Sequence, residues 1–283
     1  KVYYKIETGK PYIIRDVYFD ISDPLLSYYV LADTSNCLVR RGNNYDVDIL
    51  EKEQNRITKE LRNNGYFNFT KDYVYYRIDS SLNSTQVDIV IRIKNFSVPM
   101  MGTDSILEVP HTRFYINSIL IQTDYAPKSS NAVSDTTRLN DYTFLSSGKS
   151  EYSPKVLADA VSFTVGELYQ TKKAEATYKR LSELKAFKFI NISFTPKLAY
   201  TDKLDCFIRL TPVLKQSFSV ETEGTYTGGN LGIAGSVVYQ NRNVFHGAEI
   251  LELKFKGALE GQKLVQEIPD SPEELVRLNT FEI

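Results

Sequence analysis

The sequence predicts an α+β protein in which a strand-helix-helix-strand-strand module occurs twice and is followed by β-structure of a different kind. Residues 87–93, Val-Asp-Ile-Val-Ile-Arg-Ile, match residues 204–210, Leu-Asp-Cys-Phe-Ile-Arg-Leu, position for position. A strong helical period precedes the first of these segments, and a two-residue alternation of apolar residues begins after residue 225. The matching strands therefore indicate that a whole domain recurs.

The composition is that of a nearly neutral globular protein. The 283 residues are enough for two or three domains, and 42% of them are hydrophobic. A net charge of -1 gives no basic face, so no nucleic-acid partner is expected. The 20 Tyr and 15 Phe favour many strands. No apolar run approaches the roughly 18 residues that a membrane-spanning helix requires.

The first ten residues predict a strand and not a signal peptide. They lack a charged start followed by an apolar block. Val2, Tyr4 and Ile6 alternate with polar residues, and Gly9 stops the pattern. A strand that opens at the first residue indicates an excerpt from a longer chain.

The first strand of each module follows one pattern, and a helix start follows each strand. Tyr12, Ile14, Val17 and Phe19 are echoed by Phe114, Ile116, Ile119 and Ile121. Asp23-Pro24 and Ser153-Pro154 then place a capping side chain before a proline at the first helical position. In the second copy, residues 125–152 form an insert rich in Ser, Asn, Thr and Asp, which predicts a long surface loop.

The second helix of the first module gives the clearest helical signal. Apolar or long side chains recur at steps of three and four at Val47, Leu50, Gln54, Ile57 and Leu61. Asp48 with Glu51 resembles a capping box, and Gly65 stands where a left-handed residue ends a helix. In the second module Thr171 is the candidate cap, and the residues expected to face inward are Ala174, Tyr178, Leu181 and Leu184.

Each second helix is followed by a hairpin, with turns around residues 80–83 and 196–202. In the last strand of the first hairpin, one face is apolar throughout, at Val87, Ile89, Ile91 and Ile93, and Val90 lies on the other. This pattern suits the middle strand of a small sheet with two helices on one side.

The tail alternates with the period of a strand. Leu231, Ile233, Val237 and Tyr239 alternate with small or polar residues, and so do Leu251, Leu253, Phe255 and Leu259. Strands of about ten residues, apolar outward and small or charged inward, are typical of an outer-membrane barrel. A soluble hairpin with one buried face would give the same alternation. Glycines 229, 232 and 235 do not indicate a nucleotide site, because strand residues and not a helix follow them.

The order of elements, with Gly65-Tyr66-Phe67 closing the second helix, resembles the POTRA domain of the BamA/TamA family of outer-membrane assembly proteins. The second copy departs from the family pattern with Ala186-Phe187. Residues 230–257 are similar to the family's first barrel hairpin. The long insert resembles the elaborated last POTRA domain of Bacteroides-type relatives.

The resemblance implies a division of the chain into tandem POTRA domains and the first strands of a β-barrel. The expected segments are the closing strand of a preceding domain at 1–9, a POTRA domain at 10–97, a linker at 98–112, a last POTRA domain at 113–222 with its insert at 125–152, and barrel strands at 223–283.

The function that the resemblance implies is assembly of β-barrel proteins, or translocation of substrates, by an outer-membrane protein whose POTRA region lies in the periplasm. Unfolded outer-membrane proteins or secreted substrates would pair with an edge strand. The residues expected to bind them are Tyr73, Val74, Tyr75, Tyr76, Arg77, Phe189, Ile190, Asn191 and Ile192. Packing of these tyrosines within the protein is the competing interpretation. Accessory outer-membrane or periplasmic proteins are further expected partners.

Two other functions fit the same resemblance, and catalysis does not. A dedicated two-partner secretion pore or receptor, and a structural surface antigen, stay open. His111 and His246 are far apart in the sequence, so no catalytic triad, metal site or cofactor is expected. Glu249 and Glu252 fall on opposite faces of a strand. Cys206 aligns with Ile89 and is expected to be a buried hydrophobe, not the partner of Cys37 in a disulfide.

Overall fold

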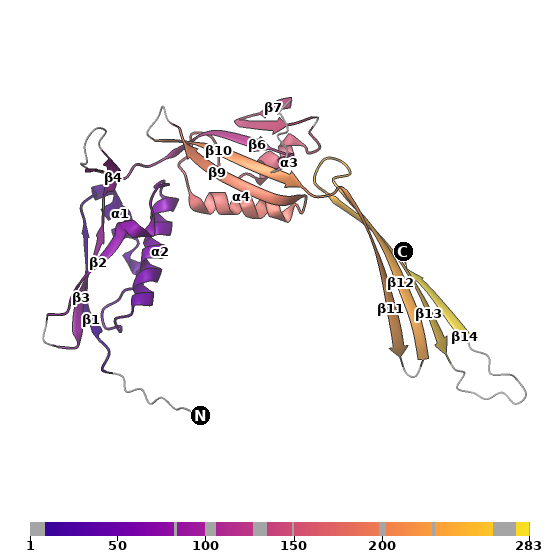
Figure 1. Ribbon diagram of the computed structural model, residues 1–283, viewed down its shortest axis with the longest axis horizontal. Coiled ribbons are helices and arrows are strands. Elements are labelled where there is room, and N and C mark those ends of the chain that lie inside the picture. Colours follow the sequence, from indigo (N-terminus) through magenta and orange to yellow (C-terminus); the bar gives the residue numbers. More distant parts are fainter. Residues whose placement is uncertain are drawn as a thin grey trace, which may run out of the picture. The chain divides into compact units, whose positions relative to one another are not determined.

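The computed structural model describes residues 9–81, 84–99, 106–126, 135–148, 150–197, 202–227, 230–262 and 276–282 (Figure 1). The strand predicted for residues 1–9 lies outside this part, apart from Gly9. The chain forms two compact units. One comprises Lys1–Ile119, Ser162–Thr177 and Ser193–Cys206, and the other comprises Leu120–Val161, Tyr178–Ile192 and Phe207–Ile283.

The first module has the predicted order of elements. These are β1 (Ile13–Ile21), α1 (Pro24–Ala32), α2 (Val47–Asn63), β2 (Val74–Asp79) and β3 (Gln86–Ile93), with short 3-10 turns η1 (Thr34–Asn36) and η2 (Lys71–Tyr73). The sheet order is β1-β3-β2, with β1 parallel and β2 antiparallel to β3. The α+β prediction is confirmed.

The central strand β3 separates a core face from a charged face. Val87, Ile89, Ile91 and Ile93 are buried in one cluster with residues of both helices, which lie on one side of the sheet (Figure 1). On the other face Arg15 Nε donates to Asp88 at 2.8 Å, and Arg92 Nε donates to Asp20 at 2.7 Å. The predicted inward face of β3 is therefore confirmed.

Helix starts follow the predicted chemistry at α1 and depart from it at α2. The Asp23 side chain accepts the N–H groups of Leu25 and Leu26 at 2.9 and 3.2 Å. At α2 the cap is Asp46, so the capping box predicted at Asp48 and Glu51 is wrong. Val47, the first residue of the predicted helical period, is 63% exposed. At the other end of α2, Gly65 has φ +97°, the left-handed conformation predicted for it.

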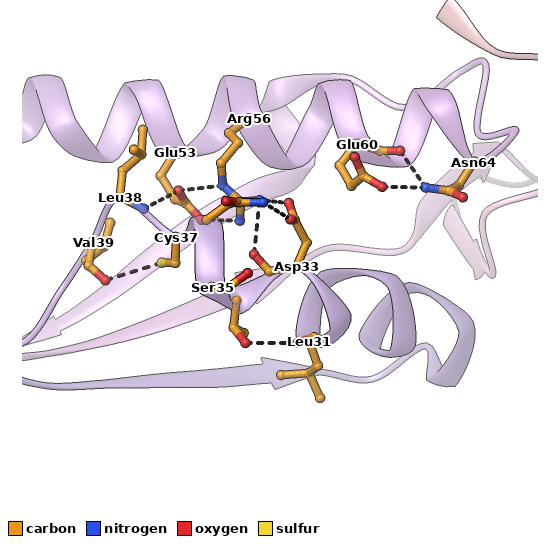
Figure 2. A network of polar contacts seen from close by, with 12 residues as sticks. Leu31, Asp33, Ser35, Cys37, Leu38, Val39, Glu53, Arg56, Glu60 and Asn64 are labelled. Carbon is orange, nitrogen blue, oxygen red and sulfur yellow. Dashed lines mark hydrogen bonds and ion pairs between the residues drawn. The ribbon is translucent and has the colours of Figure 1, made fainter. Parts of the chain in front are cut away.

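Buried hydrogen bonds and ion pairs, which the sequence did not indicate, connect α2 to the segment after α1 (Figure 2). Glu53 is fully buried and accepts the Leu38 N–H and the Arg56 Nε–H, both at 2.9 Å. Arg56 also pairs with Asp33. Burial, and then the charge of Glu53, raise the pKa of the Cys37 thiol to about 11. The connection from Asp33 to Leu38 is thus held to the helix by polar bonds.

The second module repeats this plan with an added hairpin. Its elements are β6 (Tyr115–Gln122), β7 (Asp135–Leu139), β8 (Tyr142–Ser146), α3 (Pro154–Ala160), α4 (Thr171–Glu183), β9 (Phe187–Pro196) and β10 (Lys203–Pro212). The sheet order is β7-β8-β6-β10-β9. Every inward residue of β10 is fully buried, namely Leu204, Cys206, Ile208 and Leu210. Cys206 is buried, as expected, and Cys37 is buried as well; both are free thiols.

The insert of the second module is not only a loop, so that prediction is wrong. β7 and β8 pair antiparallel through a two-residue turn at Asn140-Asp141, in which Asn140 has φ +52°. Tyr142 and Phe144 of β8 are buried, and β8 lies beside β6. In α4, Tyr178 was predicted to face inward but is 52% exposed, whereas Leu181 is buried as predicted.

Within the first unit, the turn after α2 packs on residues of the second module. Gly65 O accepts the Phe114 N–H at 2.8 Å, and Phe67 lies 5.1 Å from the ring of Tyr169. The Asn63 side chain accepts the Lys172 N–H at 2.9 Å and so caps α4. A Cβ added at Gly65 would approach the Leu168 side chain to 2.6 Å. The glycine is therefore needed for both its φ and this close approach.

The tail forms an open four-stranded antiparallel sheet with two different faces. Its strands are β11 (Gln216–Thr227), β12 (Asn230–Arg242), β13 (Ile250–Gln262) and β14 (Val276–Glu282). The register places the exposed apolar side chains on one face, at Phe218, Val220, Ile233, Val237, Leu253, Phe255 and Leu259. The other face carries Glu221, Glu223, Ala234, Ser236, Lys254 and Lys256.

Two further features concern the segments that connect the modules and the tail. β4 (Phe96–Pro99), which begins before the linker predicted at 98–112, pairs with β5 (Ile106–Val109) inside that linker as a two-stranded ribbon. β11 begins at Gln216, before residue 223, where the sequence places the start of the tail. No helix in the described ranges is sufficiently long and apolar to cross a membrane.

Replacing Glu53 by Ala is expected to lower the free energy of unfolding of the first module by about 3 kcal/mol, because Arg56 and the Leu38 N–H lose a buried partner. Denaturant titration monitored on this module measures the loss. The matched control is Glu51→Ala on the same helix, whose ion pair with Lys71 is exposed and contributes little. Equal losses in the two variants would contradict the role given to Glu53.

Candidate functional site

The sheet topology leaves two hairpin strands at sheet edges. β2 lies at one edge of the first sheet, and β9 lies at one edge of the second. These are the strands in which the sequence places its candidate binding residues. An edge strand presents backbone N–H and C=O groups that another strand can pair with.

The register of β2 decides which of its backbone groups point outward. Lys94 N–H donates to Tyr73 O at 2.9 Å, and Tyr75 and Arg77 continue this row of bonds to β3. Because bonding alternates in an antiparallel pair, Val74, Tyr76 and Ile78 point their backbone groups away from β3. Val74 is already engaged, since its N–H bonds Lys71 O and its C=O accepts Gln54 Nε2 at 2.7 Å. Tyr76 and Ile78 therefore offer the outward groups of this edge.

The tyrosines of this strand have different surroundings. The Tyr76 hydroxyl donates to Leu50 O at 2.7 Å, and burial raises its pKa. Tyr73 lies in the turn before β2, and its ring is 4.6 Å from the His111 ring. The Lys94 ammonium lies 5.3 Å from the centre of the Tyr75 ring. Tyr73 and Tyr76 thus hold the strand in place, and Tyr75 with exposed Arg77 lies on the opposite face.

β9 is a longer edge with more exposed side chains. Phe189 is 57% exposed, with the Lys188 ammonium 5.4 Å from its ring centre. Asn191 is exposed, and Ile190 and Ile192 are half-buried. An apolar side chain beside a lysine on an edge strand can contact an added strand, while the charge discourages self-association.

On the opposite sides of the two sheets, the chain itself pairs with the start of β1 and with β6. Along β1, Ile14 N–H donates to Asn43 O at 2.9 Å, and Gly42 N–H donates to Ile14 O at 2.8 Å. Along β6, the hairpin strand β8 adds to the sheet. Sequence reasoning missed this hairpin, although the alternation around Asn140-Asp141 was a signal for it. β7 is then the other edge of the second sheet. β2 and β9, which carry the predicted binding residues, are the candidate docking edges.

His111 and Glu249 have structural roles. His111 is buried, and its Nε2 lies 2.9 Å from Lys94 O. Glu249 binds N–H groups of the turn after β12, and the bond from Phe245 N–H lowers its pKa. The residues that the structure describes contain no group of three or more His, Cys, Asp or Glu placed to hold a metal ion.

Comparison with known proteins rests on structure. No protein-family profile matches the sequence, and no curated protein matches it. The crystal structure of BamA from Haemophilus ducreyi lacking POTRA domains 1–3 aligns with 90% of this chain at a TM-score of 0.50 and 13% identity. The chain has a POTRA fold. It spans 44% of that BamA chain, and at this identity the similarity concerns the fold.

Two further structures align with this chain at lower TM-scores. POTRA domains 3–5 of BamA from Haemophilus influenzae cover 71% of this chain and 61% of their own, at 12% identity and a TM-score of 0.43. CdiB from Acinetobacter baumannii covers 90% of this chain and 40% of its own, at 14% identity and a TM-score of 0.41.

The stability of the first POTRA module is expected to fall between pH 7.5 and 5.5. Burial lowers the pKa of His111 below its ordinary value of 6.5. The unfolded chain then binds a proton at His111 more readily than the folded chain does. The contribution of His111 to the free energy of unfolding is therefore full above pH 6.5 and is lost as the pH falls. Thermal unfolding across this window measures the effect.

His111→Phe should flatten this pH dependence while lowering stability at pH 7.5 through loss of the bond to Lys94. The matched control substitutes the exposed His246 by Asn. A pH profile of His111→Phe that still parallels the wild type would show that another group is responsible.

Proposed function

We propose that this chain is the periplasmic POTRA region, with the first membrane strands, of a bacterial outer-membrane protein that assembles β-barrel proteins or moves substrates across that membrane. Its clients are unfolded outer-membrane proteins or secreted substrates, which add as strands to β2 and β9. The observation that carries the proposal is the outward backbone of Tyr76 and Ile78 on an edge strand with one pairing partner among the described residues.

Backbone pairing suits clients of many sequences. A strand added beside Tyr76 and Ile78 makes about four hydrogen bonds, each contributing about 0.5–1.5 kcal/mol net. Ordering the client residues opposes this by about 1–2 kcal/mol per residue. Each edge therefore binds weakly, with side-chain contacts at Tyr75 or Phe189 adding to the affinity. Weak and reversible binding is what a client that must be released requires.

The tail sheet fits a membrane on one face. β12 and β13 each have 13 residues, more than the roughly 9–11 that a tilted strand needs to cross a bilayer. Phe218, Val220 and Ile233 are each 72% exposed on the apolar face, which suits lipid. The face with Glu221 and Lys254, joined at 3.8 Å, suits a polar interior. The proposal places this sheet in the outer membrane and the POTRA modules in the periplasm.

The chemistry proposed is assembly without catalysis. No covalent step or cofactor is assigned to the chain, and accessory outer-membrane or periplasmic proteins are proposed as partners. Assignment of the protein to the TamA-like, surface-antigen or Bacteroides-type relatives stays a prediction from the sequence.

Ile78→Pro is expected to reduce crosslinking of an unfolded outer-membrane strand peptide to β2 at least tenfold. Proline removes the outward N–H, whereas an edge strand tolerates the ring itself. The measurement uses a peptide with a photo-activated crosslinker. Ile78→Ala is the matched control, because it shortens the same side chain and keeps the N–H. Undiminished crosslinking in Ile78→Pro would exclude β2 as the docking edge.

Depletion of the protein from its cell is expected to lower the amounts of many outer-membrane proteins together, because backbone pairing does not select one sequence. Quantitative proteomics of the outer membrane measures this. Loss of one secreted protein would instead support a dedicated two-partner secretion pore, and an unchanged proteome would support a structural surface antigen.

A further inference from the structure

The connection between β12 and β13 is an unusually constrained turn. Three of its residues, none of them glycine, have positive φ: Asn243 at +75°, His246 at +66° and Ala248 at +60°. Such conformations are strained for residues with a side chain and persist only where surrounding bonds hold them. The bonds that hold this turn come from inside it and from the second POTRA module.

Two side chains fix the turn internally. The Glu249 carboxylate accepts the N–H groups of Phe245 and Gly247, the latter at 2.8 Å. Asn243 Oδ1 accepts the Ala248 N–H at 3.0 Å, and Asn243 N–H donates to Glu249 O at 2.7 Å. The turn therefore has a hydrogen-bond network of its own, in addition to its contacts with another element.

Three hydrogen bonds then join the turn to the segment before α3. Asn243 Nδ2 donates to Glu151 O at 2.7 Å, and His246 Nδ1 lies 2.6 Å from the same oxygen. Ser153 N–H donates to His246 O at 2.7 Å. Asn243 is only 1% exposed, so its amide is enclosed in this contact. All of these residues belong to the second compact unit.

The same segment is anchored to the start of β9. Tyr152 is buried, its hydroxyl donates to Ala186 O at 3.3 Å, and its ring lies 4.9 Å from that of Phe187, the first residue of β9. A continuous series of contacts thus runs from the β12–β13 turn through Tyr152 to β9.

We propose that the Asn243–Glu249 turn is a docking element at the end of the tail sheet, β11–β14. The turn fixes Glu151–Ser153 to this sheet and, through Tyr152, also fixes the start of β9 to it. A client strand captured on β9 is thereby held at the first membrane strands. This functional consequence rests on the proposed function, whereas the docking itself does not.

Asn243→Asp separates docking from the shape of the turn. The aspartate keeps the acceptor for the Ala248 N–H but replaces the donor to Glu151 O with a second acceptor, which the carbonyl repels. Residue-resolved hydrogen exchange of the full-length protein is the measurement. The Ser153 amide should exchange at least tenfold faster than in the wild type, while the Ala248 amide keeps its protection.

Ala248→Gly is the matched control, because it relieves a positive φ without touching the docking atoms, and it should leave Ser153 protected. Unchanged exchange of Ser153 in Asn243→Asp, or an unprotected Ser153 in the wild type, would overturn the docking claim.

A second measurement tests the consequence for clients. In the full-length protein in lipid vesicles, Asn243→Asp should keep crosslinking of a client strand to β9 and reduce client insertion at least threefold. Unreduced insertion would overturn the link to β9. If the wild type captures no client on β9, the proposed function fails, and the exchange experiment alone decides the docking claim.

Discussion

Each POTRA module depends on one buried side chain of its second helix that satisfies a backbone N–H of the connection after the first helix. In the first module Glu53 accepts the Leu38 N–H, and in the second Thr177 Oγ1 accepts the Ser162 N–H, both at 2.9 Å. Glu53 and Thr177 are both fully buried, and each is the seventh residue of its helix. An unpaired N–H there would carry the full cost of its desolvation, so the position must be polar in both copies.

The need to satisfy backbone N–H and C=O groups also determines which sheet edges are covered. A three-stranded sheet satisfies its central strand on both sides and leaves two edges. The first module covers the start of β1 with residues 42–45, and the second covers β6 with its hairpin. The hairpin shows that this sheet accepts an added strand, because β8 has done so within the chain. β2 and β9 lack such cover among the described residues, and the proposed function uses this difference.

The sequence predicted what depends on local pattern and missed what depends on tertiary partners. The repeat, the central strands and the Asp23-Pro24 helix start were correct, since each has a period or a cap that is visible locally. Glu53 was missed, because a glutamate on a polar helix is ordinarily exposed and its partners lie beyond the helix. The edge position of β2 was predicted, but the engagement of Val74 by Lys71 and Gln54 depends on the register and a helix side chain. The outward backbone groups that remain for pairing are therefore those of Tyr76 and Ile78.

Capture of unfolded strands by β2 is tested most directly by the exchange rate of a single amide proton. The account predicts that the Ile78 amide becomes protected when an unfolded outer-membrane strand is added, while the Arg77 amide, already bonded to β3, changes little. An Ile78 amide that exchanges at the same rate with and without a saturating client strand would contradict docking at this edge.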